Sequence, residues 1–165
     1  MASSIQLAAG DPAMLAAVKR ARKLLNRRAL VAAAASAVPI PGVDWLVDAA
    51  LLSKLIPAIN EEFGLTPEHI AALPSRKREQ VEKAVSVVGS MVIGKFITRD
   101  LVIRAAAAAG RRLTVKQATK YVPIAGQAIS ALIGYGAIRY LGEEHIRDCV
   151  QVCRQAQLQL PSARD

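Results

Sequence analysis

Apolar residues recur at helical spacing along most of the chain, and proline or glycine separates the resulting blocks. The first predicted helix runs from Ala13 to Arg28 behind Pro12, with one apolar side and a cluster of cations. An uncharged segment from Ala29 to Val43 follows. There, Pro39-Ile40-Pro41-Gly42 ends an Ala-rich helix in a sharp turn, because a proline cannot supply a helical N–H.

Signals for the start and end of helices are clear in the middle of the chain. Asp44 to Phe63 is predicted as a helix that contains Pro57, with the Asp44 carboxylate at the positive end of the helix dipole. Gly64 marks its end. Thr66-Pro67 then predicts a new helix to about Leu73, with a hydroxyl at the N-cap and proline at the first helical position.

A long core helix capped by Ser75 is predicted next, because its apolar residues keep a 3.6-residue spacing: Val81, Val85, Val88, Val92 and Phe96. The uncharged stretch from Tyr121 to Ile138 contains Pro123, and an amphipathic helix follows from Glu143 to Leu158. We therefore expect an all-α bundle of about six to eight helices with two apolar hairpins.

Composition supports one all-α domain. The 165 residues are 53% hydrophobic and only 4% aromatic, which suits one buried core of closely packed small-residue helices. We predict a single domain over residues 12–158, with flexible ends at 1–11 and 159–165.

The net charge of +9 favours anionic partners. Each basic segment stands beside an apolar one, as expected for a protein at an anionic membrane surface. Solvated helix faces are the alternative interpretation. The candidate headgroup-binding residues, with Trp45 near the interface, are Lys19, Arg20, Arg22, Lys23, Arg27, Arg28, Arg111 and Arg112.

Two turns share a pattern, Val38-Pro39-Ile40-Pro41-Gly42 and Val122-Pro123-Ile124-Ala125-Gly126. Together with Asp44, the Glu62-Phe63-Gly64-Leu65 helix end and Leu141-Gly142, they resemble the domain-of-unknown-function family of YcjF-type membrane proteins and GTPase-associated helical domains. The chain is more weakly similar to the helical domain of immunity-related GTPases. The resemblance implies an all-α module that works beside a GTPase or at a membrane, and it carries no catalytic residues.

Two patterns could carry other chemistry. His145, Cys149 and Cys153 share one helix face and could bind a soft metal, but a fourth ligand is not evident and packing as free thiols is favoured. Gly89 to Phe96 approaches the phosphate-binding pattern G-x-x-x-x-G-K-[ST], but Phe96 replaces the hydroxyl. We expect Gly89 and Gly94 to permit close helix packing instead.

The residues present do not form a recognisable catalytic set, so we expect a non-enzymatic protein without cofactor or metal. Nucleic acid is disfavoured as a partner, because few aromatic residues lie among the cations. The expected partners are a membrane surface and another protein, such as a GTPase encoded separately. The alternative is a helical protein that self-associates without touching lipid. With two cysteines and no secretion signal, we expect an intracellular protein, in the cytoplasm or at the inner membrane.

Overall fold

The computed structural model describes residues 3–36, 44–95, 104 and 126–160. Within these ranges the chain is all-α, as predicted, and contains no strand. The helices are α1 (Ser4–Ala8), α2 (Pro12–Ser36), α3 (Asp44–Glu62), α4 (Pro67–Ala72), α5 (Ser75–Val88) and α7 (Gly126–Ala156).

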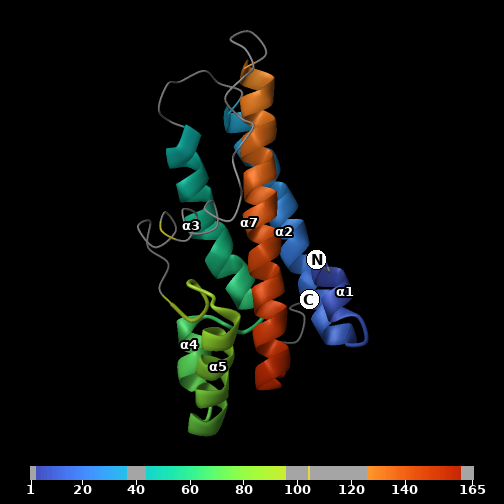
Figure 1. Cartoon of the computed structure of the whole chain (residues 1–165), viewed down its shortest axis with the longest axis vertical. Helices are drawn as coiled ribbons and strands as arrows, with labels where there is room; N and C mark the ends of the chain where they lie inside the picture. Colours follow the sequence, from blue (N-terminus) through green and yellow to red (C-terminus); the bar gives the residue numbers. More distant parts are fainter. Residues whose placement is uncertain (1–2, 37–43, 96–103, 105–125, 161–165) are drawn as a thin grey trace.

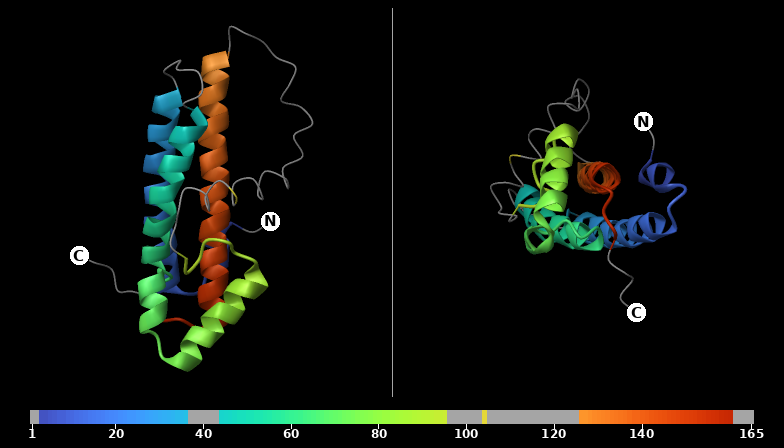
Figure 2. Two further views of the ribbon diagram at one scale, coloured as in Figure 1. Left: turned by 90° about the vertical axis from the view of Figure 1, so that its left-hand side faces the viewer. Right: turned by 90° about the horizontal axis from the view of Figure 1, so that it is seen from below.

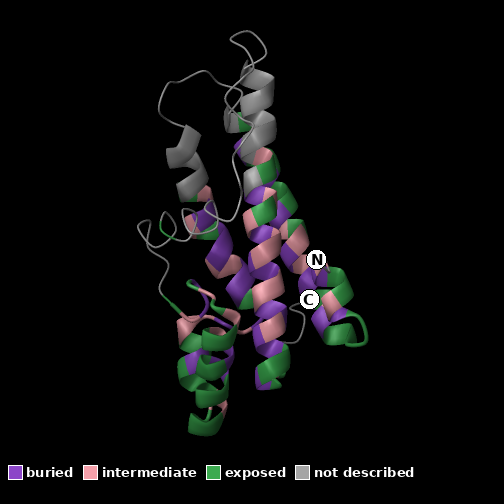
Figure 3. Ribbon diagram, viewed as in Figure 1, coloured by how far each residue is buried: buried purple, intermediate pink, exposed green. Residues whose placement is uncertain are grey.

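Three long helices, α2, α3 and α7, lie side by side (Figures 1 and 2). Helix α2 runs antiparallel to the other two. The short α1 packs against α2 and α7, and α5 packs against the last turns of α7 with α4 beside it. The core therefore lies between the three long helices and extends under α5 (Figure 3).

Small residues let α2 and α7 approach closely. The side of α2 that faces the core carries Ala21, Ala29 and Ala32, all fully buried, around Leu25. Opposite them on α7 is Gly142, where an added Cβ would lie 2.9 Å from Leu25 Cδ2 and closer still to Cδ1. The absence of a side chain at Gly142 thus leaves the space that Leu25 fills.

The end of α3 and the start of α4 confirm the predicted signals. Gly64 adopts φ +66°, its N–H donates to the Glu61 carbonyl (3.1 Å), and the Leu65 N–H donates to the Asn60 carbonyl (2.8 Å). This is a Schellman motif, which glycine favours because it has no Cβ to clash. Thr66 then caps α4 by accepting a hydrogen bond from the His69 N–H.

Two cations of α5 donate hydrogen bonds to carbonyls at the C-terminal ends of two other helices. The Lys77 ammonium donates to the carbonyls of Ala156 and Gln157 at 3.1 Å each, where α7 ends. The Arg78 guanidinium donates to the Ala71 carbonyl at 2.9 Å, at the end of α4. Both contacts place positive charge at the negative end of a helix dipole and satisfy carbonyls that lack a helical partner.

The predicted core helix from Ser75 to Phe96 is wrong at both ends. Its N-cap is Pro74, without a side-chain hydrogen bond, and the helix stops at Val88 because Gly89 turns left-handed with φ +74°. Val92 is still buried, but in the non-helical segment that follows. The prediction that Gly89 permits close helix packing is wrong, because an added Cβ there would meet nothing within 4 Å. Gly94 has φ +68° and lies close to the Ile70 side chain.

The N-terminal segment, predicted to be flexible, contains α1. Ser3 and Gln6 form a capping box, and Ala8 is fully buried against the bundle. Hydrogen bonds at the helix start and this burial offset the entropy of ordering a short segment. Helix α2 also differs from the prediction: the basic and Ala-rich segments form one continuous helix up to Ser36. Residues 161–165 lie outside the described part.

Candidate functional site

Three cations form a stripe on the outer side of α2. Lys19, Lys23 and Arg27 follow one another at four-residue intervals, and all three are exposed. This spacing places them on one helix face over about 12 Å of its length. None of them has a carboxylate partner in the described part of the chain. Arg28 is also exposed, but it follows Arg27 directly and therefore points about 100° away from Arg27 around the helix.

The other two predicted cations of α2 have a different role. Arg20 Nε lies 2.5 Å from Glu62 Oε2 of α3, and Arg22 Nε lies 3.3 Å from Glu143 Oε2 of α7. Both arginine side chains are about two-thirds buried, with exposed fractions of 32% and 28%. They join α2 to its neighbours, and they are not part of the exposed stripe.

Exposed apolar side chains extend the same face of α2. Leu30 and Val31 lie three and four residues beyond Arg27, with exposed fractions of 62% and 52%. We call the surface made by Lys19, Lys23, Arg27, Leu30 and Val31 the α2 outer face. It combines positive charge with accessible hydrocarbon on one side of a single helix.

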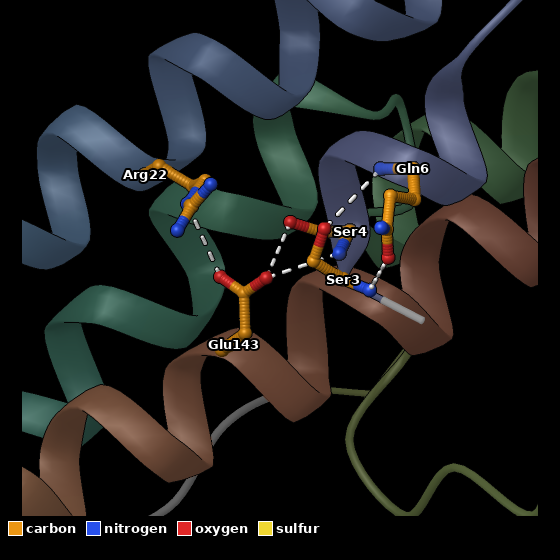
Figure 4. Close-up of polar contacts among 5 residues, drawn as sticks. All are labelled: Ser3, Ser4, Gln6, Arg22 and Glu143. Carbon is orange, nitrogen blue, oxygen red and sulfur yellow. Dashed lines mark hydrogen bonds and ion pairs between the residues drawn. The ribbon is translucent and has the colours of Figure 1, made fainter. Parts of the chain in front are cut away.

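Glu143 connects three helices, as Figure 4 shows. Its Oε1 accepts hydrogen bonds from the Ser4 N–H (3.0 Å) and the Ser4 hydroxyl (2.6 Å), while Oε2 pairs with Arg22. A carboxylate at the N-terminus of α1 satisfies an N–H that has no partner within its own helix. This role could not be predicted from the sequence, because Ser4 and Glu143 are 139 positions apart and neither belongs to a recognisable motif.

A second polar cluster is buried between α3 and α7. Asn60 Nδ2 donates to the Val92 carbonyl at 3.3 Å, so Asn60 Oδ1 is the acceptor of this amide, and the Cys149 thiol donates to it at 3.7 Å. Asn60 Oδ1 lies 2.8 Å from His145 Nε2, and this nitrogen must therefore carry the proton. Burial lowers the pKa of His145 to about 4, which keeps the ring neutral near pH 7.

Asn60, His145 and Cys149 share the composition of a cysteine-protease triad, but their geometry does not suit nucleophile activation. Cys149 Sγ and Asn60 Oδ1 both approach the same nitrogen, His145 Nε2, at 3.7 Å and 2.8 Å. A protonated Nε2 cannot accept the thiol proton. Burial also raises the pKa of the Cys149 thiol well above its ordinary value. This arrangement joins helices and does not generate a thiolate.

Both cysteines are buried free thiols, as predicted. The Cys153 thiol donates to the Phe63 carbonyl at 3.6 Å, and burial raises its pKa to about 12. In the described residues no group of three or more His, Cys, Asp or Glu side chains could hold a metal ion. Packing of α7 against the end of α3 accounts for His145, Cys149 and Cys153.

The segment that approaches a phosphate-binding pattern also has a structural role. It follows helix α5, whereas a phosphate-binding loop follows a strand. The Gly94 N–H donates to the Leu65 carbonyl at 3.2 Å and is not free to contact a phosphate.

The remaining predicted residues lie mostly outside the described part of the chain: Arg111, Arg112, Pro39, Pro41, Gly42 and Pro123. Asp44 and Gly126 are the first residues of α3 and α7. Among the described helices, none has the length and apolar character that a membrane crossing requires. The chain matches no protein-family model, and it has no significant match among curated proteins or solved structures.

Proposed function

We propose that the chain is a non-enzymatic helical accessory module that associates with an anionic membrane surface through the α2 outer face. The observation that carries the proposal is the row of three exposed cations, for which the described residues offer no carboxylate partner, continuous with two exposed apolar side chains. The net charge of +9 favours approach to any anionic surface.

The three cations attract the protein to an anionic bilayer strongly enough to change its partitioning measurably. A Lys or Arg near an anionic bilayer contributes roughly 1 kcal/mol, so the three together are worth on the order of a 100-fold change in partitioning. Exposed charges are screened within about 8–10 Å at physiological ionic strength. Binding through them therefore weakens as salt is added.

Co-sedimentation with vesicles tests the proposal. The full chain is mixed with phosphatidylglycerol-containing vesicles or with neutral phosphatidylcholine vesicles, at low and high salt. We expect binding only to the anionic vesicles. The triple variant Lys19→Glu, Lys23→Glu, Arg27→Glu should lose this binding by 100-fold or more.

A matched control variant tests whether vesicle binding depends on the α2 outer face or only on the net charge of the protein. Lys54, Lys83 and Lys95 are exposed cations outside α2, and changing all three to Glu alters the net charge by the same amount. This variant should keep most of the binding. Equal losses in the two variants would show that only total charge matters. No binding at low salt would refute the proposal and favour the self-associating alternative, which light scattering would then report as a larger mass.

The partner and the complete architecture belong to the same proposal. The resemblance of the two Pro/Gly turns to GTPase-associated domains supports a separately encoded GTPase as the protein partner. We also propose that the whole chain forms one bundle of about six to eight helices, with an apolar hairpin at each turn. A location in the cytoplasm or at the inner membrane agrees with a protein whose two cysteines are free thiols.

A further inference from the structure

Leu30 and Val31 form a pair of adjacent, exposed apolar side chains on α2. Their exposed fractions of 62% and 52% exceed those of the neighbouring core positions Ala29 and Ala32, which are fully buried. The described helices that pack on α2, namely α1, α3 and α7, leave these two side chains uncovered. Water contact at this pair costs free energy that burial in an apolar medium would recover.

The cations next to Leu30 and Val31 indicate what kind of apolar surface covers these side chains. Arg27 precedes it by one helical turn, and Lys23 and Lys19 follow at one-turn intervals toward the start of the helix. An apolar surface on a partner protein would not neutralise this row of cations. An anionic bilayer offers both parts together, with phosphates for the cations and acyl chains just beneath them for the apolar pair.

We propose that Leu30 and Val31 insert into the acyl boundary of an anionic membrane while Lys19, Lys23 and Arg27 contact its phosphates. The inference rests on the proposed function and adds the depth and the lipid chemistry of the contact. Arg27 can extend its guanidinium back to the headgroups while its methylene groups lie beside the apolar pair. The helix remains at the interface, with its apolar end within about 5–10 Å of the headgroup boundary.

A polarity-sensitive label locates the insertion. Leu30→Cys carries an NBD label in one sample, and Lys83→Cys on α5 carries it in the control. The native Cys149 and Cys153 are buried and at most 1% exposed, so surface labelling leaves them largely unmodified. With anionic vesicles, the label at position 30 should shift to the blue and gain intensity, while the label at position 83 should not change.

Resistance to salt provides an independent measurement. Inserted side chains hold the protein on anionic vesicles after the cations are screened, so a fraction should stay bound at high salt. The double variant Leu30→Ser, Val31→Ser should reduce this salt-resistant partitioning by on the order of tenfold or more. The control Val87→Ser, Met91→Ser removes exposed apolar side chains from the α5 region and should retain it.

The outcomes distinguish this inference from the proposed function. Salt-reversible binding to anionic vesicles, without a shift of the label at position 30, overturns insertion and leaves surface association intact. Absence of any binding overturns both. If the wild type is a dimer and the Leu30→Ser, Val31→Ser variant a monomer by light scattering, the pair is a contact between copies of this chain and insertion is refuted.

Discussion

The close approach of α2 and α7 at Gly142 makes the bundle sensitive to a single methyl group. In Gly142→Ala, the new Cβ would lie 3.1 Å from Leu25 Cγ and 2.9 Å from Cδ2, with Cδ1 nearer still. Leu25 cannot move outward, because it is fully buried. The methyl group must therefore displace the leucine or push the two helices apart.

The expected size of the effect follows from two opposing contributions. Replacing a helical glycine by alanine gains about 1 kcal/mol of helix propensity. Overpacking a filled core costs about 1–3 kcal/mol, and the severe overlap here places Gly142→Ala near the upper end of that range. We expect a net loss of about 2 kcal/mol in the free energy of unfolding.

Gly136 provides the control in the same helix. A Cβ at this exposed position would meet nothing within 4 Å, so Gly136→Ala should stabilise the protein by about 0.5–1 kcal/mol. Urea denaturation followed by circular dichroism measures both variants, and the slope with denaturant should not change. In a Leu25→Ala background the clash is absent, and Gly142→Ala should then be neutral or stabilising. If Gly142→Ala alone stabilises as much as Gly136→Ala, the packing argument is wrong.

Three further predictions concern polar contacts. Burial lowers the pKa of His145 to about 4 in the folded protein, against an ordinary 6.5 in the unfolded chain. As the pH falls, the unfolded chain therefore binds the proton at a higher pH than the folded protein does. The free energy of unfolding should fall by about 3 kcal/mol between pH 6.5 and 4. His145→Gln should remove most of this pH dependence when the free energy of unfolding is measured by urea denaturation at each pH. If the pH dependence is unchanged in this variant, groups other than His145 cause it. Glu143→Ala removes the acceptor for both Ser4 donors and should make cleavage between α1 and α2 faster in limited proteolysis, whereas Glu144→Ala should not. Lys77→Met removes the contacts with the Ala156 and Gln157 carbonyls and should lower thermal stability by a few degrees, whereas Lys83→Met should leave it unchanged.

Local signals were the part of the fold that the sequence could predict. Asp44 begins α3, Gly64 ends it, and Thr66-Pro67 begins α4, because each signal acts through the backbone of its own few residues. Gly89 shows the limit of periodicity. The apolar spacing continues past it to Val92, which is buried without being helical, so the pattern reported burial and not helix length.

The candidate site depended on contacts that no local pattern encodes. The six cations of α2 look equivalent in the sequence, yet Arg20 and Arg22 pair with carboxylates 42 and 121 positions away. The spacing of cations on a helix predicts which of them share a face, but not which have a partner. The importance of Asn60 could not have been predicted either, since its partners lie in α7 and in the segment after α5.

Asn60 takes part in both the end of α3 and its contacts with other segments. Its backbone carbonyl accepts the Leu65 N–H that terminates α3, and its side chain links α7 to the segment around Val92. The last turn of α3 therefore cannot fray without also breaking its attachments to both of those elements. We therefore expect the amides of this last turn to exchange with solvent more slowly than those of a helix end without such attachments.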